Sequence, residues 1–445
     1  MPEELISELG RQLNAYLLNA WEIYLIKEQG CQIEVREQNL ESFEQENHLS
    51  LALRVISQKK LGFGYSTDFR MENLKKLVKA VIDRAHASDV DPDLVLPKEQ
   101  EPSKLLLGIF DSEFSKIPVS QKIEKVMKME RSALEVDSRV KRVRECKYSE
   151  NLSQVWIINS YGLNQNQSST FFTIFLSAVA EDKDEAQIAS EFDFSFSYHL
   201  LPWEKTGQGA GKKAIAKLGA RSVPSQKSAV IFSPEVAGEF LDLLSFALSG
   251  ENLAKNKSWL KGKEGGRLFS EKITIIDDGL FLSGPGCFPF DDEGVNTRKK
   301  ILMDKGELQG FLFNSYYGNK LKKGSSGNAV REGVAVPPSI APTNLYLVPG
   351  KRSQEEMIKE LDRGLLVEEV LGMHTADEIS GEFSVGVSGH WIEKGRIGEA
   401  VAQVAIAGSL KELFSRVLEV GNDLKFYGPC GSGSILIEEL EISGS

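Results

Sequence analysis

The sequence predicts an α+β protein in which two similar α+β units are followed by a larger, β-rich C-terminal domain. Segments with helical spacing of apolar residues alternate with strand-like runs through the first half, and a Gly-rich, strand-rich stretch fills the second half. The length of 445 residues is enough for two or three domains. We place the three units at residues 1–90, 103–223 and 228–445.

The first unit has a helix at each end and strand-like runs between them. Apolar residues recur at helical spacing over Glu3–Leu18 and again over Met71–Ser88. The runs between these helices, within residues 21–69, indicate a small antiparallel sheet. Prolines and acidic residues interrupt any regular pattern over Asp91–Pro102, and we expect a linker there.

The second unit repeats this order of elements without any residue-level repeat. A predicted helix over Ser120–Asp137 precedes strand-like runs over Val140–Gly162 and Gln167–Asp182. Another helix is expected over Gly211–Ser222. We place the main domain boundary after it, near Val223–Lys227.

The third unit opens with a strand and an apolar helix. Ser233 is expected to cap this helix, Pro234 to occupy its first turn, and its apolar part to cover Gly238–Asn252. Glycine-punctuated strands follow toward the C-terminus.

Two glycine-rich motifs lack the residues that their chemistry needs. TGQGAGKKA, Thr206–Ala214, has no glycine at Thr206 and no hydroxyl residue at Lys213, so it is not a phosphate loop, and we predict a flexible loop. GVSGHW, Gly386–Trp391, lacks the Gly-x-Ser-x-Gly elbow of a serine hydrolase, and a turn between strands is the preferred interpretation.

Acidic pairs and histidines supply further candidates. The stretches TIIDDG, Thr274–Gly279, and FDDEGV, Phe290–Val295, could bind a hard cation or act in acid/base chemistry. The same pattern is typical of a strand that ends in an Asp-Gly turn, which we favour. The histidines show no metal-ligand spacing; they are His48, His86, His199, His374 and His390.

Composition excludes several classes of protein. A net charge of −11 and a pI near 5.3 argue against nucleic acid as a partner. Cys31, Cys146, Cys287 and Cys430 form no Cys-x-x-Cys pair, which excludes a zinc ribbon or disulfide framework visible by spacing and fits a reducing cytoplasm. No signal-peptide pattern and no membrane-spanning apolar run is evident, so we expect a cytoplasmic protein without membrane association.

From Ala229 onward the order of motifs resembles the TldD/PmbA family, also called the modulator of DNA gyrase family. The matching stretches include VIFSPEVAGEFLDLLSFALSGEN, SWLKGKEGGRLFSEKITIIDDG, FDDEGVNTRKKILMDKGELQGFLFNSYYGNK and GEFSVGVSGHWIEKGRIGEAVAQVAIAGSLKELF. Upstream, LALRVISQKKLGFGYSTDF and GKKAIAKLGARSVP match more loosely. The resemblance implies an α+β fold with a β-rich C-terminal domain.

The resemblance also implies a subunit of a heteromeric zinc metalloprotease. The TldD-like branch carries zinc on a His-Glu-x-x-x-His helix, with a cysteine near the C-terminus as a further ligand. Alignment with that helix puts Leu241 and Phe246 at the histidine positions, Asp242 at the glutamate position and Cys430 near the cysteine position. Neither Leu241 nor Phe246 can donate an electron pair to zinc, so this chain is similar to the PmbA/TldE-like branch, which lacks the motif.

Three hypotheses follow for function. In the first, the chain is a non-catalytic subunit without metal or catalytic residues, which pairs in a heterodimer with a zinc-bearing TldD-like subunit that cleaves peptides or small unfolded proteins. A homodimer in the absence of that partner is left open. In the second, the chain is a peptidase by itself and uses Asp291, Asp292, Glu293, His390 or Cys430, with His374 a further candidate ligand. In the third, it regulates another protein, such as gyrase or a toxin system.

Overall fold

The structure, a computed structural model, describes residues 2–101 and 108–444. It confirms the predicted α+β class, with strands gathered into three sheets of six, six and six strands and one two-stranded ribbon among these residues. The predicted unit ends at residues 1, 103 and 445, and the linker end at Pro102, lie outside the described residues.

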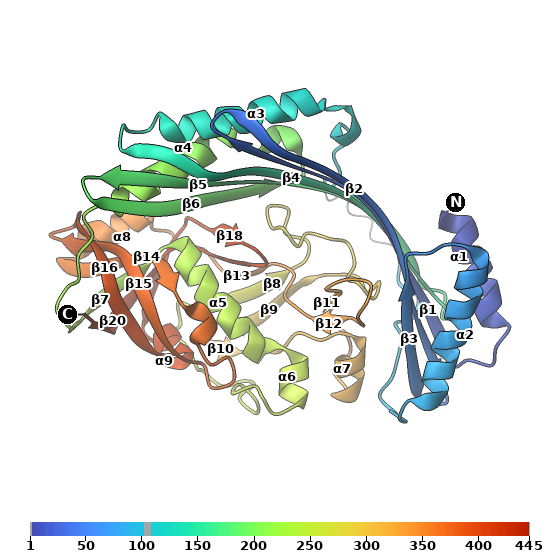
Figure 1. Cartoon of the computed structure of the whole chain (residues 1–445). Coiled ribbons are helices and arrows are strands. Elements are labelled where there is room, and N and C mark those ends of the chain that lie inside the picture. The colour runs from blue at the N-terminus through green and yellow to red at the C-terminus, as the bar shows by residue number, and fades with distance from the viewer. Residues whose placement is uncertain (1, 102–107, 445) are drawn as a thin grey trace.

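The first half of the chain forms one strongly curved antiparallel sheet in the strand order β3-β2-β1-β4-β5-β6 (Figure 1). β1 pairs with β4 over residues 22–34, so the two predicted α+β units contribute to a single sheet. The strands are β1 (Ala20–Arg36), β2 (Asn39–Ser57), β3 (Lys60–Ser66), β4 (Val140–Asn159), β5 (Asn164–Asp182) and β6 (Glu185–Ser195).

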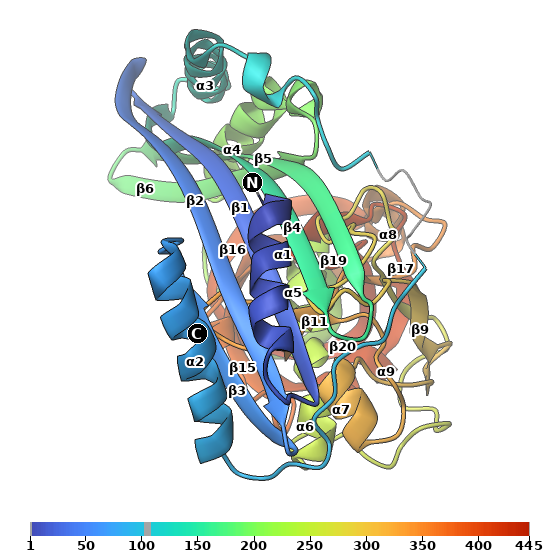
Figure 2. The ribbon, with the colours of Figure 1, turned by 90° about the vertical axis from the view of Figure 1, so that its right-hand side faces the viewer.

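Four helices cover the convex face of this sheet in two pairs (Figures 1 and 2). Side chains alternate between the faces of a strand, and Ile23 and Leu25 of β1 pack under the first pair, while Ile33 packs under the second. The intervening Tyr24 faces the C-terminal half instead. The helices are α1 (Pro2–Asn14), α2 (Met71–Ala87), α3 (Val119–Leu134) and α4 (Trp203–Ala216), and the short 3-10 turns η1 (Phe114–Lys116) and η2 (Tyr198–Leu200) flank the second pair.

The loop predicted over Thr206–Ala214 is wrong, because this stretch lies inside α4. Its glycines allow α4 to approach α3 closely. A Cβ atom at Gly207 would lie 2.2 Å from the backbone oxygen of Met129, and one at Gly211 would lie 2.9 Å from that of Ala133. Glycine usually weakens a helix, but tight helix packing requires it here. The helix also ends at Ala216, before the predicted end at Ser222.

The C-terminal half contains two further six-stranded sheets, ordered β10-β9-β8-β13-β19-β18 and β16-β15-β14-β7-β20-β17, and the ribbon β11-β12. The strands are β7 (Gln226–Phe232), β8 (Ile275–Asp278), β9 (Lys299–Asp304), β10 (Glu307–Leu308), β11 (Ala329–Val330), β12 (Ser339–Ile340), β13 (Leu345–Leu347), β14 (Arg363–Leu371), β15 (Glu382–Glu393), β16 (Arg396–Ser409), β17 (Val417–Val420), β18 (Lys425–Tyr427), β19 (Cys430–Ser432) and β20 (Ile435–Ser443).

The helix α5 (Pro234–Leu248) packs between these two sheets, and its buried side chains share one core with Ile275 of β8, Leu345 of β13 and Val367 of β14. The whole C-terminal half lies against the concave face of the N-terminal sheet (Figure 1). The other helical segments are α6 (Gly250–Ala254), α7 (Ser315–Lys320), α8 (Gln354–Glu360), η3 (Met373–Thr375) and α9 (Leu410–Ser415).

The turn predicted over Gly386–Trp391 is also wrong, because this stretch lies within β15. The pairing register with β16 shifts between Val387 and Gly389 and again between His390 and Ile392, so Gly389 borders the first of two irregularities. A Cβ atom at Gly389 would lie 1.9 Å from the backbone oxygen of Leu366, which explains why the strand has glycine at this position.

The described part of the predicted linker, Asp91–Glu101, has no helix or strand but is anchored to both halves. Two of its contacts are with α7. Asp91 accepts a hydrogen bond from the Tyr316 hydroxyl at 2.7 Å, and Asp93 pairs with Lys320 at 3.0 Å. Asn159 of β4 donates to the Pro97 carbonyl at 2.8 Å. Among the described residues, no helix combines the length and apolar character needed to cross a bilayer.

Candidate functional site

The helix α5 begins as its sequence predicts. Ser233 caps it by accepting a hydrogen bond from the Val236 backbone N–H, and Pro234 occupies the first turn. The helix is shorter than the predicted apolar stretch, because it ends at Leu248. Ser249 is extended and separates α5 from α6. There the Gly250 N–H donates to the Leu312 carbonyl at 2.8 Å instead of continuing the helix.

The four positions predicted as remnants of a metal site fall into two groups. Leu241 is completely buried in the core, and Phe246 is half-buried on the same helix. Asp242 is exposed, and it accepts a hydrogen bond from the Cys430 thiol of β19, with 3.4 Å between Sγ and Oδ1. The structure therefore brings Asp242 and Cys430 together, while Leu241 serves in core packing.

The donor atoms near Cys430 do not fit a zinc site. Burial, followed by the charges of Asp242 and Asp277, raises the pKa of the Cys430 thiol well above its ordinary value. The thiol donates its hydrogen bond to Asp242. Zinc takes at least three protein ligands, and the described residues contain no group of three histidine, cysteine or acidic side chains able to hold a metal ion.

The exposed face of α5 carries three acidic residues, Glu235, Glu239 and Asp242. Glu235 pairs with Lys213 of α4 at 3.2 Å, and Lys213 also pairs with Glu191 of β6 at 2.9 Å. No cation within residues 2–101 and 108–444 pairs with Glu239 in the same way. Burial raises its pKa to about 7, and the neighbouring charges of Glu235, Glu369 and Asp242 act in the same direction.

Replacement of Glu239 by glutamine should make the protein more stable at pH 8 and leave its stability almost unchanged at pH 5. The folded-state pKa lies above that of the unfolded chain, so ionisation opposes folding as pH rises from about 5 to 7. Because the carboxyl is partly solvated, we expect a gain of only about 1 kcal/mol at pH 8. Urea unfolding at both pH values measures it.

The matched control for this pH effect is Glu251→Gln, at a surface position paired with Lys255. That variant should show no gain at pH 8. An equal gain for Glu239→Gln at both pH values would contradict the assignment of a raised pKa.

The residues of the autonomous-peptidase hypothesis are held in separate contacts within the described structure. His390 of β15 contacts Glu368 at 2.5 Å and the Ala216 carbonyl at 3.1 Å, which ties β15 to the end of α4. His374 is exposed in η3. Cys430 contacts Asp242. The other three cysteines, Cys31, Cys146 and Cys287, are buried, and burial raises the pKa of each thiol.

The predicted turns after the acidic pairs are present. Asp278 ends β8, and its carboxylate accepts a hydrogen bond from the Leu280 N–H at 3.0 Å. In the second stretch, the Gly294 N–H donates to the Asp291 carbonyl at 2.8 Å, and Gly294 has a φ of +79°. The Asp291 carboxylate accepts three backbone N–H bonds, from Glu293, Val295 and Ala329, so it organises this loop.

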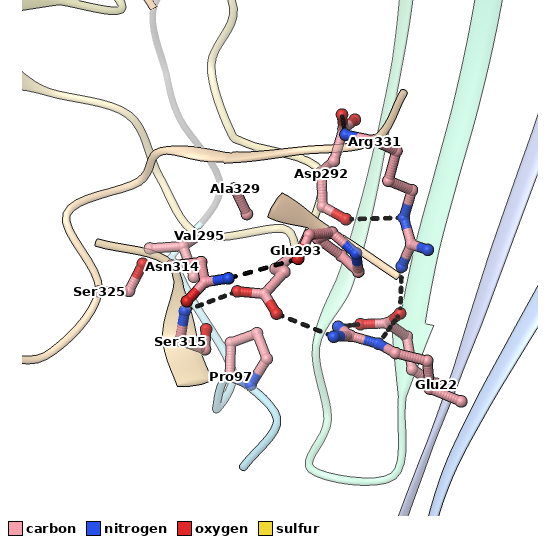
Figure 3. Close-up of polar contacts among 12 residues, drawn as sticks. Glu22, Pro97, Asp292, Glu293, Val295, Asn314, Ser315, Ser325, Ala329 and Arg331 are labelled. Atoms are coloured by element: carbon pink, nitrogen blue, oxygen red, sulfur yellow. Dashed lines mark hydrogen bonds and ion pairs between the residues drawn. The ribbon is translucent and has the colours of Figure 1, made fainter. Parts of the chain in front are cut away.

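Glu293 instead takes part in a buried group of four charged residues that we call the arginine latch: Glu22, Arg54, Glu293 and Arg331. Arg54 of β2 contacts Glu22 of β1 at 2.8 Å and Glu293 at 2.9 Å. Arg331 contacts Glu22 at 2.6 Å. Figure 3 shows the contact between Arg331 and Glu22 and the bond from the Ser315 N–H to Glu293, whose length is 2.8 Å. The latch joins the N-terminal sheet to the loops of the C-terminal half.

The arginine latch borders a cavity of about 520 Å³, which we call the central hollow. The hollow lies between the concave face of the N-terminal sheet and the loops around Phe288, Arg331 and Pro429. Its volume is in the range of small-ligand sites, about 300–1,000 Å³. Aromatic and aliphatic side chains dominate its wall: Tyr24, Val155, Phe171, Phe196, Phe288 and Phe290.

Sequence reasoning missed Glu22, Arg54 and Arg331. A signal was present, since Glu22 and Arg54 are charged residues within otherwise apolar strand sequences, AWEIYLI and LALRVIS. Such residues are seldom buried unless they are paired. Their partners could not be identified from sequence because Arg331 lies 309 residues from Glu22.

Profiles of one family match almost the whole chain. They are the PmbA/TldA metallopeptidase domain 1 (residues 21–85), central domain (112–218) and C-terminal domain (225–444). The chain belongs to the PmbA/TldD family. The family resemblance inferred from the sequence motifs is thereby confirmed.

Individual relatives of this PmbA/TldD-family chain carry metalloprotease, TldE and DNA gyrase modulator names. A metalloprotease PmbA homolog of Buchnera aphidicola subsp. Acyrthosiphon pisum is 29% identical over 98% of this chain and 95% of its own length. The crystal structure of TldE from Thermococcus kodakarensis has a TM-score of 0.91 and 25% identity, and covers 99% of this chain and 100% of its own. A Thermotoga maritima MSB8 structure described as a modulator of a DNA gyrase has a TM-score of 0.90 and 27% identity, with full coverage of both chains.

Proposed function

We propose that this PmbA/TldD-family chain is a non-catalytic, TldE-type subunit of a cytoplasmic metalloprotease whose zinc is held by a TldD-type partner. The observation that carries the proposal is the donor set beside α5. Among the described residues, the potential donors that meet there are Asp242 and the Cys430 thiol, and Leu241 is packed in the core. A zinc ion that activates water needs at least three protein ligands.

Two further observations support a role as a partner rather than as an autonomous peptidase. The acidic residues Asp291 and Glu293 are occupied by backbone N–H groups and by Arg54. His390 is engaged by Glu368 and by the end of α4. None of these three side chains is free to act as a general base without first breaking contacts that hold the fold together.

Metal content and peptide hydrolysis test the proposal. The purified chain, a TldD-type chain from the same genome, and an equimolar mixture are assayed for zinc and for hydrolysis of casein and short peptides. We expect no stoichiometric zinc and no hydrolysis for this chain alone, and more hydrolysis in the mixture than for the TldD-type chain alone. Stoichiometric zinc in this chain, together with cleavage in the absence of the partner, would refute the proposal.

A control experiment identifies which of the two chains supplies the hydrolytic activity. Replacing the glutamate of the partner's His-Glu-x-x-x-His motif should abolish hydrolysis in the mixture, because that glutamate is the expected general base. Asp242→Asn in this chain should leave hydrolysis by the mixture intact. Loss of activity with Asp242→Asn in a folded mixture would instead assign a catalytic role to this chain.

A further inference from the structure

The central hollow collects buried polar atoms that lack hydrogen-bond partners. Across the described residues, six buried side-chain atoms have no partner, and three of these belong to residues that line the hollow. The three are Oδ1 of Asn151, Oε1 of Gln167 and Nη1 of Arg331. Each such atom costs about 1–3 kcal/mol of folding free energy, and native proteins contain few of them. Because three of the six atoms belong to residues that line one cavity, we consider the central hollow as a ligand site.

The two unpartnered acceptors, on the side chains of Asn151 and Gln167, are separated by about the same distance as two backbone N–H groups of an extended peptide. Asn151 lies on β4 and Gln167 on the neighbouring strand β5, where Gln167 pairs with Val155. The offset from Asn151 to Val155 is four residues, or about 13 Å along the strand direction. Backbone N–H groups four residues apart in an extended peptide point to the same side and span the same distance.

The charge around Arg331 favours a neutral acceptor as the partner of its free N–H group. Two carboxylates contact the two guanidinium groups: Glu22 contacts both Arg54 and Arg331, and Glu293 contacts Arg54. Two further carboxyls lie in the same loop, where Asp292 accepts from the Arg331 backbone N–H and Asp291 accepts only backbone N–H groups. Burial raises the pKa of Asp291 and Asp292. Even with both of them protonated, the remaining two carboxylates balance the two arginines. A carboxylate ligand would therefore find no excess of positive charge to neutralise it. A peptide carbonyl is uncharged and can accept a hydrogen bond without such an excess.

The wall of the central hollow selects the side chains of such a ligand. Phe171 stacks on Phe194 with 5.5 Å between ring centroids, and Phe196 meets Phe288 edge-on at 6.3 Å. These rings offer contact to aromatic and aliphatic groups. An acidic side chain would lose its hydration here beside arginines that are already balanced by Glu22 and Glu293.

We infer that the central hollow binds an uncharged, extended peptide segment with aromatic or aliphatic side chains. Its backbone N–H groups donate to Asn151 and Gln167, and one of its carbonyls accepts from Arg331. The inference rests on the proposed peptide-related function, and it adds a peptide-binding site in this chain that is separate from the Asp242–Cys430 pair.

Isothermal titration of the full chain with defined peptides tests the inference. The probe is an acetylated and amidated tetrapeptide of alternating alanine and phenylalanine. A matched peptide has glutamate in place of phenylalanine, and a third has a free C-terminal carboxylate. We expect the amidated phenylalanine peptide to bind, the glutamate peptide to show no measurable binding, and the free acid to bind more weakly than the amide.

Two substitutions in the hollow locate the binding. Gln167→Leu removes an unpartnered acceptor, so it should lower the affinity for the phenylalanine peptide about three- to tenfold. The melting temperature of this variant should be unchanged or higher. Ser153→Phe, on the same face of β4, should block binding by filling the hollow. The control is Asn166→Leu, next along β5 and exposed on the other face, which should bind like the parent chain.

The outcomes separate this inference from the proposed function. Absence of binding, equal binding of the glutamate peptide, preference for the free acid, or unchanged affinity in both hollow variants would overturn the inference. Each of these results is independent of hydrolysis by the mixture with a TldD-type chain. A mixture that fails to cleave, with the predicted pattern of peptide binding intact, would instead count against the proposed function alone.

Discussion

Replacement of Glu22 by glutamine lowers the free energy of unfolding by about 3–5 kcal/mol, the usual loss when one member of a buried ion pair is removed. Glu22 is almost completely buried and is the only acidic residue of the described chain in contact with both Arg54 and Arg331. Glutamine preserves the shape but leaves the two arginines with too little negative charge. Urea unfolding at pH 7, followed by circular dichroism, measures the loss.

Glu28→Gln is the matched control for this substitution. Glu28 lies on the same strand and the same face and is half-buried. Within the part of the chain that the structure describes, its carboxylate accepts one side-chain hydrogen bond, from the Asn151 amide at 3.3 Å. We expect a change within about 0.5 kcal/mol, as for ordinary surface substitutions. Equal losses for the two variants would mean that glutamine disturbs β1 in general and that the arginine latch contributes little.

Replacement of Gly207 by alanine should destabilise the protein by about 2 kcal/mol, through overpacking of the contact between α3 and α4. The new methyl group would lie 2.2 Å from both the Met129 carbonyl oxygen and the Ser132 hydroxyl. One of these atoms belongs to the backbone, so the helices must separate. This loss exceeds the gain of about 1 kcal/mol in helix propensity. Thermal unfolding of the variant provides the measurement.

Gly209→Ala on the same helix distinguishes packing from propensity. A Cβ atom at Gly209 would meet only the Glu191 side chain, at 3.2 Å, and that side chain can adjust. The variant should therefore be as stable as the parent chain or slightly more stable. Destabilisation of both variants to the same extent would show that the segment needs glycine for a reason other than contact with α3.

Local signals predicted most of the secondary structure. The Ser233-Pro234 start of α5 was predictable because capping and proline geometry depend on adjacent residues. The same local logic was wrong at Thr206–Ala214 and Gly386–Trp391, where glycine usually indicates a break in regular structure. In both places glycine allows close contact with a distant backbone, at Met129 and at Leu366. That contact is created by tertiary packing and has no local pattern.

Some features of the candidate site are visible in the sequence, and others appear only in the structure. The absence of histidine at Leu241 and Phe246 is visible in the sequence, and so is the thiol at Cys430. The contact between Asp242 and Cys430 spans 188 residues and needed the structure. The central hollow was not predictable either, because its polar residues Asn151 and Gln167 become neighbours of Arg331 only when the sheet curves over the C-terminal half.

The position of β20 has a consequence for biosynthesis. This strand lies inside its sheet, between β7 and β17, and pairs with β7 from Phe232 to Gln226. The partners are separated by about two hundred positions along the chain, so the sheet cannot close while a ribosome is still adding residues before Ile435. Until then, the apolar edge of β7 is exposed to other nascent chains. We expect the emerging C-terminal half to depend on chaperone protection during translation, and proteins shortened before Ile435 to be degraded rather than to accumulate.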